Sequence, residues 1–510
     1  MSDDGVDVVI GLEIHVQLDT DTKMFCGCST DYEDSEPNTH TCPTCLGLPG
    51  ALPVVNERAV EYAVKVGKAL DCDVRDETTF HRKNYFYPDL PKDFQISQYD
   101  APINEDGEVT VRVEDEEQTV GIRRAHMEED PGALVHKGGS IERATHTLID
   151  YNRSGTPLLE IVTEPDLRSP QEARALVDKL REILEYLGVF DADRGGALRV
   201  DANVSIAPAG HDDPIEEAGN RTEVKNIGSI KAVEKALAYE VTRQKNQLKR
   251  GGEVAQETRH YDGDRGVTVT LREKVGEKDY RYHREADLPP LRVAHWADEI
   301  AIPELPDARR ERFAEEYGLG DEEAEKLTSR KAVADLFEAV ADRVDADLAA
   351  TWIADELLRE LHHRDLDVAD AVGAHIHAEE GAEAADGAPG EAIPAADPEA
   401  LVDLLALVAS GDVTDRNAVE ALRTALDEDR EPAAVVEEEG LGAAGEDETM
   451  AAVTDAIDEN PGAVDDYLGG DDEAINFLVG QVMQKTGGSA DPGTANEALR
   501  ERLEELRAEQ

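Results

Sequence analysis

The chain has 510 residues, of which 40% are hydrophobic. At the usual ~150 residues per domain, this length suggests about three domains with enough apolar side chains for a core in each, which excludes a disordered chain. Its 52 Lys and Arg residues against 114 Asp and Glu residues leave a formal charge of −62. About 1 M salt would screen this repulsion, because the Debye length is then ~3 Å. We therefore predict a salt-loving source, for which an acidic balance does not exclude a nucleic-acid partner.

The N-terminus, MSDDGVDVVIGLE, lacks the basic start and the cleavage site of a signal peptide. No apolar run in the sequence approaches the ~18 residues that a membrane span requires. These features predict a cytoplasmic, soluble protein with no membrane partner.

The first part of the chain mixes strand and helix patterns. Residues 6–18 and 198–206 alternate between apolar and polar side chains, which predicts strands with Glu13 and His15 on one polar face and Arg199, Asp201 and Asn203 on another. Ser169, Pro170 and Glu172 are typical of a helix start, and this helix should end at Gly188. A second helix should run from Ser229 to about Arg250. We expect an α+β domain over residues 1–293, with a mixed or antiparallel sheet.

From Ala294 onward the strand patterns end, and helical periods rich in Ala, Glu, Asp, Leu and Arg replace them. We expect an all-α domain over residues 294–440 and a small helical tail over residues 441–510. Residues 378–400 contain almost no large apolar side chain, which predicts a disordered acidic insertion.

Four of the five cysteines form the pattern C-x-C, thirteen residues, C-x2-C, at Cys26, Cys28, Cys42 and Cys45. Two close pairs of thiolates joined by a short loop suit tetrahedral zinc, and a site with four cysteines leaves no open position for a substrate. We therefore favour a structural zinc, the alternative being four reduced thiols without a metal.

A second constellation comprises Glu13, His15, the segment HMEED that contains Glu128 and Glu129, and Glu160 within the apolar run LLEIV. A carboxylate inside an apolar strand is unfavourable unless it is paired or bound to a metal. Spacing alone leaves two interpretations open: a site for a hard metal such as Mg²⁺, or salt bridges to Arg123, Arg124 or Arg153.

Residues 80–100, FHRKNYFYPDLPKDFQISQYD, combine basic and aromatic side chains in an otherwise acidic chain. They could be an ordinary aromatic loop, or a loop in which Arg82 and Lys83 contact phosphate while a ring such as Tyr85 stacks on a base. The sequence contains no Walker-A motif, so any nucleotide site must be built without that loop.

Several segments resemble, in order, the B-subunit family of aspartyl/glutamyl-tRNA amidotransferases. They are VIGLEIHVQL, the cysteine pairs followed by LGLPGALPVVN, RKNYFYPDLPKDFQISQYD, RRAHMEEDPG, DYNRSGTPLLEIVTEPD, LRVDANVSI, RTEVKNIGS and, near the end, FLVGQVMQKTGG. The resemblance implies a cradle-shaped catalytic domain and a YqeY-like tail that binds tRNA.

The resemblance also implies a reaction. In this family, ATP phosphorylates the side-chain carboxylate of Asp or Glu that is misacylated on tRNA(Asn) or tRNA(Gln), and ammonia then displaces the phosphate. An amidase A subunit supplies the ammonia from glutamine, and a small C subunit completes the heterotrimer. Mg²⁺ is implied at Glu13, His15, Glu129 and Glu160, with Glu128 as a neighbour, and Lys83 is expected to assist the phosphoryl transfer. The cysteines match members that carry zinc.

Two alternatives remain at this point. One is the E subunit of the two-component archaeal glutamyl-tRNA amidotransferase, which shares the catalytic motifs but has an additional synthetase-like domain. The helical pattern after Arg292 leaves no room for that domain. The other is a zinc-stabilised scaffold that binds tRNA without catalysis.

Lys485 is the single lysine between Ala332 and Gln510, and it lies in the tail motif. Two interpretations are open: a cation at a helix C-terminus just before Gly487, or a contact to a tRNA phosphate.

The acidic surplus generates a prediction about salt. Dilution from molar KCl to about 0.1 M should loosen or unfold the protein, because the screening of 62 excess negative charges is lost. Circular dichroism during the dilution would show this, whereas an unchanged spectrum and melting point across the range would contradict it.

Overall fold

The computed structural model describes residues 6–509 apart from 115, 138–143, 193, 210–213, 274–279, 365, 367 and 373–392. The chain divides into two compact units, Met1–Pro306 and Asp307–Gln510. In the described residues, no helix has the length and apolar composition needed to cross a membrane.

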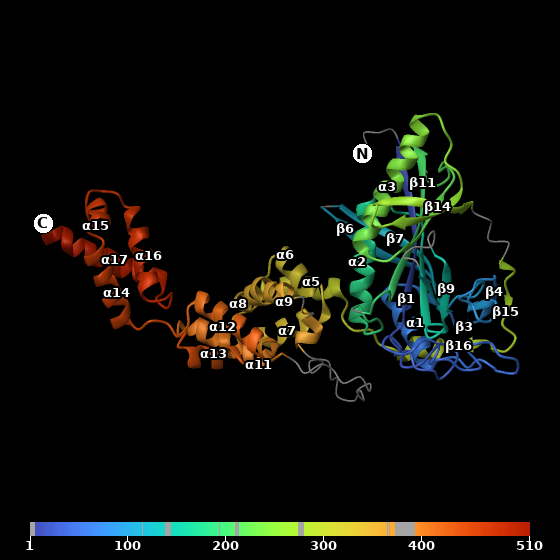
Figure 1. Cartoon of the computed structure of the whole chain (residues 1–510), viewed down its shortest axis with the longest axis horizontal. Coiled ribbons are helices and arrows are strands. Elements are labelled where there is room, and N and C mark those ends of the chain that lie inside the picture. Colours follow the sequence, from blue (N-terminus) through green and yellow to red (C-terminus); the bar gives the residue numbers. More distant parts are fainter. Residues whose placement is uncertain are drawn as a thin grey trace. The chain divides into compact units, whose positions relative to one another are not determined.

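A nine-stranded sheet forms the centre of the first unit (Figure 1). Its strand order is β14-β13-β12-β11-β1-β10-β7-β6-β2, and the parallel pair β12–β13 makes an otherwise antiparallel sheet mixed, as predicted. The strands are β1 (Val6–Gln17), β2 (Asp73–Val74), β6 (Asn104–Val113), β7 (Glu116–Glu129), β10 (Pro157–Thr163), β11 (Leu198–Pro208), β12 (Thr222–Ile227), β13 (Glu257–Asp262) and β14 (Val267–Glu273).

Three smaller sheets accompany the large one. They are β15 (His283–Arg284), β4 (His81–Asn84) and β5 (Phe94–Ser97); β16 (Leu291–Arg292) and β3 (Glu77–Thr78); and β8 (Ala133–Lys137) and β9 (His146–Asp150). The first of these joins segments that are far apart in the sequence, because β15 pairs with β4.

The core of this unit lies between the sheet and the helices α1 (Glu57–Ala69), α2 (Pro170–Tyr186) and α3 (Ile230–Lys249). Figure 1 shows α2 and α3 along the sheet. Ile10 and Ile14 on β1 are fully buried in this core, as the alternation of that segment predicts. The predicted helix starts are confirmed: Ser169 Oγ accepts the Glu172 N–H at 3.1 Å, and Ser229 Oγ accepts the Ala232 N–H at 3.2 Å.

The first unit extends beyond the predicted boundary at residue 293. The side chain of Lys68 on α1 donates to the carbonyls of Ala297, at 2.8 Å, and Ile300, at 2.6 Å. Trp296, on α4 (Ala294–Glu299), packs against the core of the sheet unit. The helical sequence pattern therefore begins before the first compact unit ends, because α4 has a helical pattern and still packs on α1.

Regular elements described beyond Arg292 are helices, in agreement with the predicted loss of strand patterns. After α4 they are α5 (Pro306–Tyr317), α6 (Asp321–Thr328), α7 (Lys331–Ala341), α8 (Ala346–Thr351), a π-helical turn (Trp352–Leu357), α9 (Leu358–His363), α10 (Val368–Val372), a 3₁₀ turn (Pro394–Ala396), α11 (Pro398–Ser410), α12 (Asp415–Glu428), α13 (Pro432–Glu439), α14 (Glu446–Glu459), α15 (Pro461–Leu468), α16 (Ala474–Lys485) and α17 (Pro492–Glu509). The last four pack around their own apolar cluster, which includes Leu478 and Leu499.

The prediction of a disordered insertion over residues 378–400 is wrong for residues 393–400, which are ordered. Residues 378–392 lie outside the described part of the chain. Ile393 N–H donates to the Ala371 carbonyl at 3.0 Å, and Ala395 and Ala396 are fully buried. Asp397 then caps α11. A shortage of large apolar side chains does not exclude packing here, because alanines allow the backbone to approach its neighbours closely.

Candidate functional site

The polar face of β1 faces away from the helices and carries the candidate catalytic residues. In the register of the sheet, His15 lies opposite Glu160 on β10, and Glu160 lies opposite His126 on β7. On the other side of β1, Glu13 lies opposite Asp201 on β11. Since side chains opposite each other on neighbouring strands project from the same face, the register gathers these groups into one row.

His15, Glu128 and Glu160 form the centre of this row and offer ligand atoms that all lie within 4.8 Å of one another. Glu160 Oε2 lies 3.5 Å from His15 Nε2 and 3.6 Å from His126 Nε2. Glu128 Oε1 lies 3.4 Å from His126 Nε2 and 3.7 Å from Lys83 Nζ. The ion-pair partners of Glu160 in the described structure are thus histidines; Arg123 and Arg153, two of the arginines considered from the sequence, pair with Glu164 and Asp130.

The electrostatics at the centre of the row favour the charged forms of Glu160, His15 and Lys83. Burial opposes ionisation of Glu160, but His126 and His15 outweigh it and hold the pKa of Glu160 well below its ordinary value. Burial likewise opposes protonation of His15, yet the hydrogen bond to Glu160 and the surrounding carboxylates raise the pKa of His15 to about 9. Glu128 outweighs burial at Lys83 and raises the pKa of this lysine well above its usual value.

A second acidic group, Glu13, Asp201 and Glu223, continues the row toward β12, and its ligand oxygens also lie within 4.8 Å of one another. Burial and the charges of Glu160 and Asp201 raise the pKa of Glu13. Lys225 Nζ balances part of this charge, 2.8 Å from Asp201 Oδ2. The alternation of residues 198–206 predicts Asp201 on a polar strand face but indicates no role for it, and the one signal for Glu223 is its place in the segment RTEVKNIGS.

Glu129 does not join the row that the sequence analysis assigned to it. Adjacent residues of a strand point to opposite faces, so Glu128 joins His15 and Glu160 instead. Glu129 is ion-paired with Lys92 and accepts the Ile96 N–H at 2.9 Å. Glu129 and Lys92 line a cavity of about 160 Å³, which Arg82 and Cys26 also line.

Only part of the basic and aromatic loop, residues 80–100, lies near the row. Lys83 faces Glu128, and the Tyr85 hydroxyl donates to Gln95 Oε1 at 3.2 Å. Arg82 is engaged elsewhere, because its guanidinium makes a bidentate pair with Glu285 at 2.6 and 2.7 Å. Of the two predicted phosphate contacts, only Lys83 therefore lies against the carboxylates.

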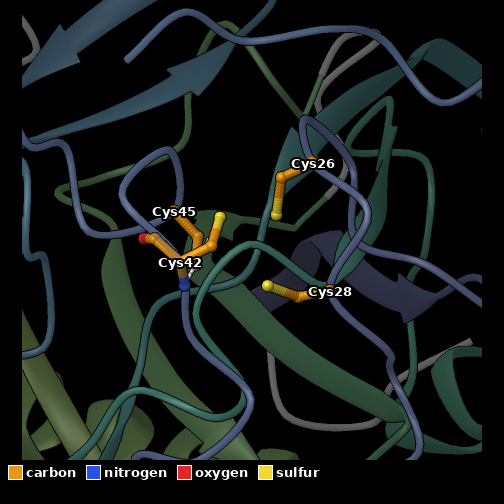
Figure 2. Close-up of side chains that lie close together, drawn as sticks. All are labelled: Cys26, Cys28, Cys42 and Cys45. Atoms are coloured by element: carbon orange, nitrogen blue, oxygen red, sulfur yellow. Dashed lines mark hydrogen bonds between the residues drawn. The ribbon is translucent and has the colours of Figure 1, made fainter. Parts of the chain in front are cut away.

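The cysteines converge as their spacing predicts. Cys26 and Cys28 come from one turn and Cys42 and Cys45 from another, and their sulfur atoms face a common space (Figure 2). The hydrogen bond from Cys26, assisted by the charge of Lys23, lowers the pKa of Cys45 to about 5. Lys23 is fully buried, and its Nζ lies 4.0 Å from Cys45 Sγ. A buried cation beside Cys45 favours the thiolate form of this residue, which is the form that binds metals.

In the second unit, Lys485 ends α16 and pairs with Glu459 Oε2 at 2.8 Å. This placement agrees with a cation at a helix C-terminus. A contact with tRNA remains a prediction.

Comparisons with known proteins match both units. Residues 8–298 match the GatB/GatE catalytic domain, and residues 335–503 match the GatB domain. These matches define the class: an amidotransferase subunit with its catalytic domain first and its helical domain second.

The relatives narrow the class further. The chain is 60% identical over 504 residues to the B subunit of the aspartyl/glutamyl-tRNA(Asn/Gln) amidotransferase of Haloquadratum walsbyi, covering 98% of this chain and 97% of that one. It is 60% identical over 503 residues to the corresponding protein of Halobacterium salinarum, covering 97% of each, and 55% identical over 503 residues to that of Methanosarcina barkeri, covering 96% and 97%. The chain belongs to the family of aspartyl/glutamyl-tRNA amidotransferase B subunits, and its halophilic relatives agree with the salt-loving source predicted from its charge.

The raised pKa of His15 predicts how stability depends on pH. The folded-state pKa of about 9 exceeds the ordinary value of 6.5, so the charged imidazolium stabilises the fold below about pH 6.5, and this contribution is lost as the pH rises through 9. In magnesium-free molar KCl with any zinc retained, the melting temperature should fall between pH 6.5 and 9. His15→Gln should remove this part of the pH dependence, and identical profiles of the two proteins would contradict it.

The cysteine group predicts a structural metal. Freshly purified protein should contain one zinc per chain, and Cys42→Ser should lower the melting temperature at constant salt much more than it lowers the rate per folded molecule. Cys72→Ser, which alters the cysteine outside the group, is the matched control. Elemental analysis that finds no zinc would end this interpretation.

Proposed function

We propose that this chain carries out the ATP- and Mg²⁺-dependent phosphorylation and transamidation of Asp or Glu misacylated on tRNA(Asn) or tRNA(Gln). The observation that carries the proposal is the buried row of carboxylates and histidines beside Lys83, in a chain that belongs to the amidotransferase B subunits. A carboxylate is a poor electrophile, so amide formation requires an activating step before ammonia attacks.

The donor atoms of the row suit Mg²⁺. Glu13, Asp201 and Glu223 supply oxygen only, and the neighbouring Asn203 Oδ1 is buried with no hydrogen-bond partner in the described residues. Hard cations prefer such oxygen ligands. His15, Glu128 and Glu160 add a mixed site next to it. A bound Mg²⁺ would neutralise charge that develops on the transferring phosphate.

The residues of the chain itself then have defined tasks. The carboxylate of the tRNA-linked amino acid attacks the γ-phosphorus of ATP, and ADP leaves. Ammonia attacks the acyl carbon, inorganic phosphate leaves, and nitrogen loses a proton. Lys83 stays protonated because Glu128 raises its pKa, so it can hold a phosphate oxygen throughout. Phosphoryl transfer depends mainly on such positioning and charge, which agrees with the lack of a Walker-A loop.

The remaining components follow from the family and the structure. The four thiols would hold a structural zinc, because their sulfur set is closed and lies apart from the carboxylate row. We assign the ammonia to an amidase A subunit joined by a small C subunit, and tRNA binding to the YqeY-like tail, residues 441–510. Residues 1–306 would then form the catalytic cradle.

The E subunit is no longer a competing interpretation, since residues 335–503 match the GatB domain and the relatives are B subunits over nearly their full length. A scaffold without catalysis predicts that the carboxylates of the row are dispensable.

The test uses the reconstituted three-subunit complex in molar salt, assayed with both misacylated tRNAs. Glu128→Gln and Glu160→Gln should each lower the amidation rate by at least about a hundredfold, because each removes a charge from the row while keeping the shape of the side chain. Glu164→Gln, a partly exposed residue just after β10 that pairs with Arg123, is the control and should change little.

Glutaminase activity of the partner subunit should remain measurable in every variant, which shows that the complex has assembled. Full amidation by both Glu128→Gln and Glu160→Gln would contradict the assignment and favour the scaffold.

A further inference from the structure

A cluster of tyrosine rings lies beside Lys83, and the sequence analysis foresaw only one of its members. Tyr85 follows β4, Tyr99 follows β5, and Tyr280 and Tyr282 immediately precede β15. The ring centroids of Tyr85 and Tyr280 are 5.7 Å apart, and those of Tyr280 and Tyr282 are 6.2 Å apart, both edge to face. Lys83 Nζ lies 5.4 Å from the centroid of Tyr280. The rings therefore continue from Lys83 toward the half-exposed Tyr99.

The outermost pair differs from the rest in its geometry. Tyr99 and Tyr282 are stacked, with centroids 4.3 Å apart and an interplanar angle of 11°. Tyr99 is 49% exposed although Tyr282 covers one face of its ring. The Tyr282 hydroxyl in turn lies within electrostatic range of Lys83, Glu128 and Glu160. Tyr282 therefore lies between the half-exposed Tyr99 ring and the carboxylate row.

Polar contacts hold this pair in place. Asn84 Nδ2 donates to the Arg281 carbonyl at 2.9 Å and contacts His283 Nδ1 at 3.1 Å, which ties the segment of Tyr282 to β4. On the other side, the His81 ring lies edge to face with Tyr99, and His81 Nε2 pairs with Asp100 Oδ1 at 3.1 Å. A platform whose rings are already ordered loses little conformational entropy when a planar ligand stacks on it.

We propose that Tyr99 and Tyr282 form a stacking platform for an adenine ring whose phosphates are directed toward Lys83. The proposal rests on the proposed function, because both ATP and the 3′-terminal nucleotide of tRNA carry adenosine. Stacking on an aromatic face requires no charge on the base and persists in molar salt, where long-range attraction to phosphate is screened. This platform would supply base binding in a chain that lacks a Walker-A motif.

The experiment measures the KM for ATP and the KM for aminoacyl-tRNA separately, on the three-subunit complex in molar KCl. Tyr99→Ala and Tyr99→Leu, which lack a ring, should raise one of the two KM values by about fivefold or more, as expected for loss of one base–aromatic stack. Tyr99→Phe keeps the ring and should stay within about twofold of the unaltered protein. Tyr87→Ala removes an equally exposed tyrosine outside the ring cluster, 51% exposed, and should change neither KM.

The two arms identify the source of the adenine. A raised KM for ATP alone assigns the platform to ATP, and a raised KM for aminoacyl-tRNA alone assigns it to the terminal adenosine. The melting temperature should stay unchanged, because Tyr99 is half exposed. Unchanged values of both KM in Tyr99→Ala, or equal losses in Tyr99→Phe and Tyr99→Ala, would overturn the proposal.

Failure of the proposed function would be distinguishable, because the unaltered complex would then show no ATP-dependent amidation. In that case equilibrium dialysis of ATP and of a CCA-ended tRNA against the complex decides the platform: weaker binding of either ligand by Tyr99→Ala supports it, and equal binding of both overturns it.

Discussion

Like-charged carboxylates held close together in a partly buried place repel one another, and the first unit of this chain is organised around that constraint. Its central strands each present an acidic side chain to the same face, namely Glu223, Asp201, Glu13, Glu160 and Glu128 in strand order. Nearby basic side chains offset this repulsion, namely His15, His126, Lys83 and Lys225. The remaining negative charge raises the pKa of His15 to about 9, and burial together with neighbouring carboxylates raises the pKa of Glu13. Both shifts favour the binding of a proton or another positive charge. A site of this kind is suited to bind cations and the phosphates they neutralise.

The opposite face of the same strands explains why the arrangement is tolerated. β1 buries Ile10 and Ile14 against the helices, and this apolar packing fixes the register that sets His15 against Glu160. A shift of the register by one residue would exchange the two faces, so the hydrophobic pattern specifies the polar row as strictly as it specifies the core. The thiols and Lys23 support a separate part of the unit and contribute no ligand to the row.

Much of this unit follows from local patterns in the sequence. Alternation predicted that Glu13 and His15 share a face, cap residues predicted the starts of α2 and α3, and cysteine spacing predicted the convergence of the four thiols. The choice between Glu128 and Glu129 could not be made in this way. They are adjacent on one strand, and only the pairing of β7 with β10 decides which of them faces Glu160.

Local sequence patterns could not predict the cluster of Tyr99 and Tyr282 either. Arg281, next to Tyr282, is 197 residues from Asn84 along the chain, and the pairing of β15 with β4 is what brings these segments together. The same limit applies to the end of the acidic insertion, where Ala395 and Ala396 are buried although Ile393 is the one large apolar residue in the sequence of residues 378–400. Long-range pairing and close packing of small residues leave little trace in a single sequence.

The central claim is that the row on β1 and its neighbours binds a divalent cation. Anomalous diffraction from crystals soaked in Mn²⁺, a substitute for Mg²⁺ with similar oxygen preference, tests it most directly. The account predicts an anomalous peak within coordination distance of His15 Nε2 and of carboxylate oxygens of Glu128 and Glu160, and loss of that peak in Glu160→Gln. A row without a peak, in which His15 stays paired with Glu160 at saturating Mn²⁺, would contradict it.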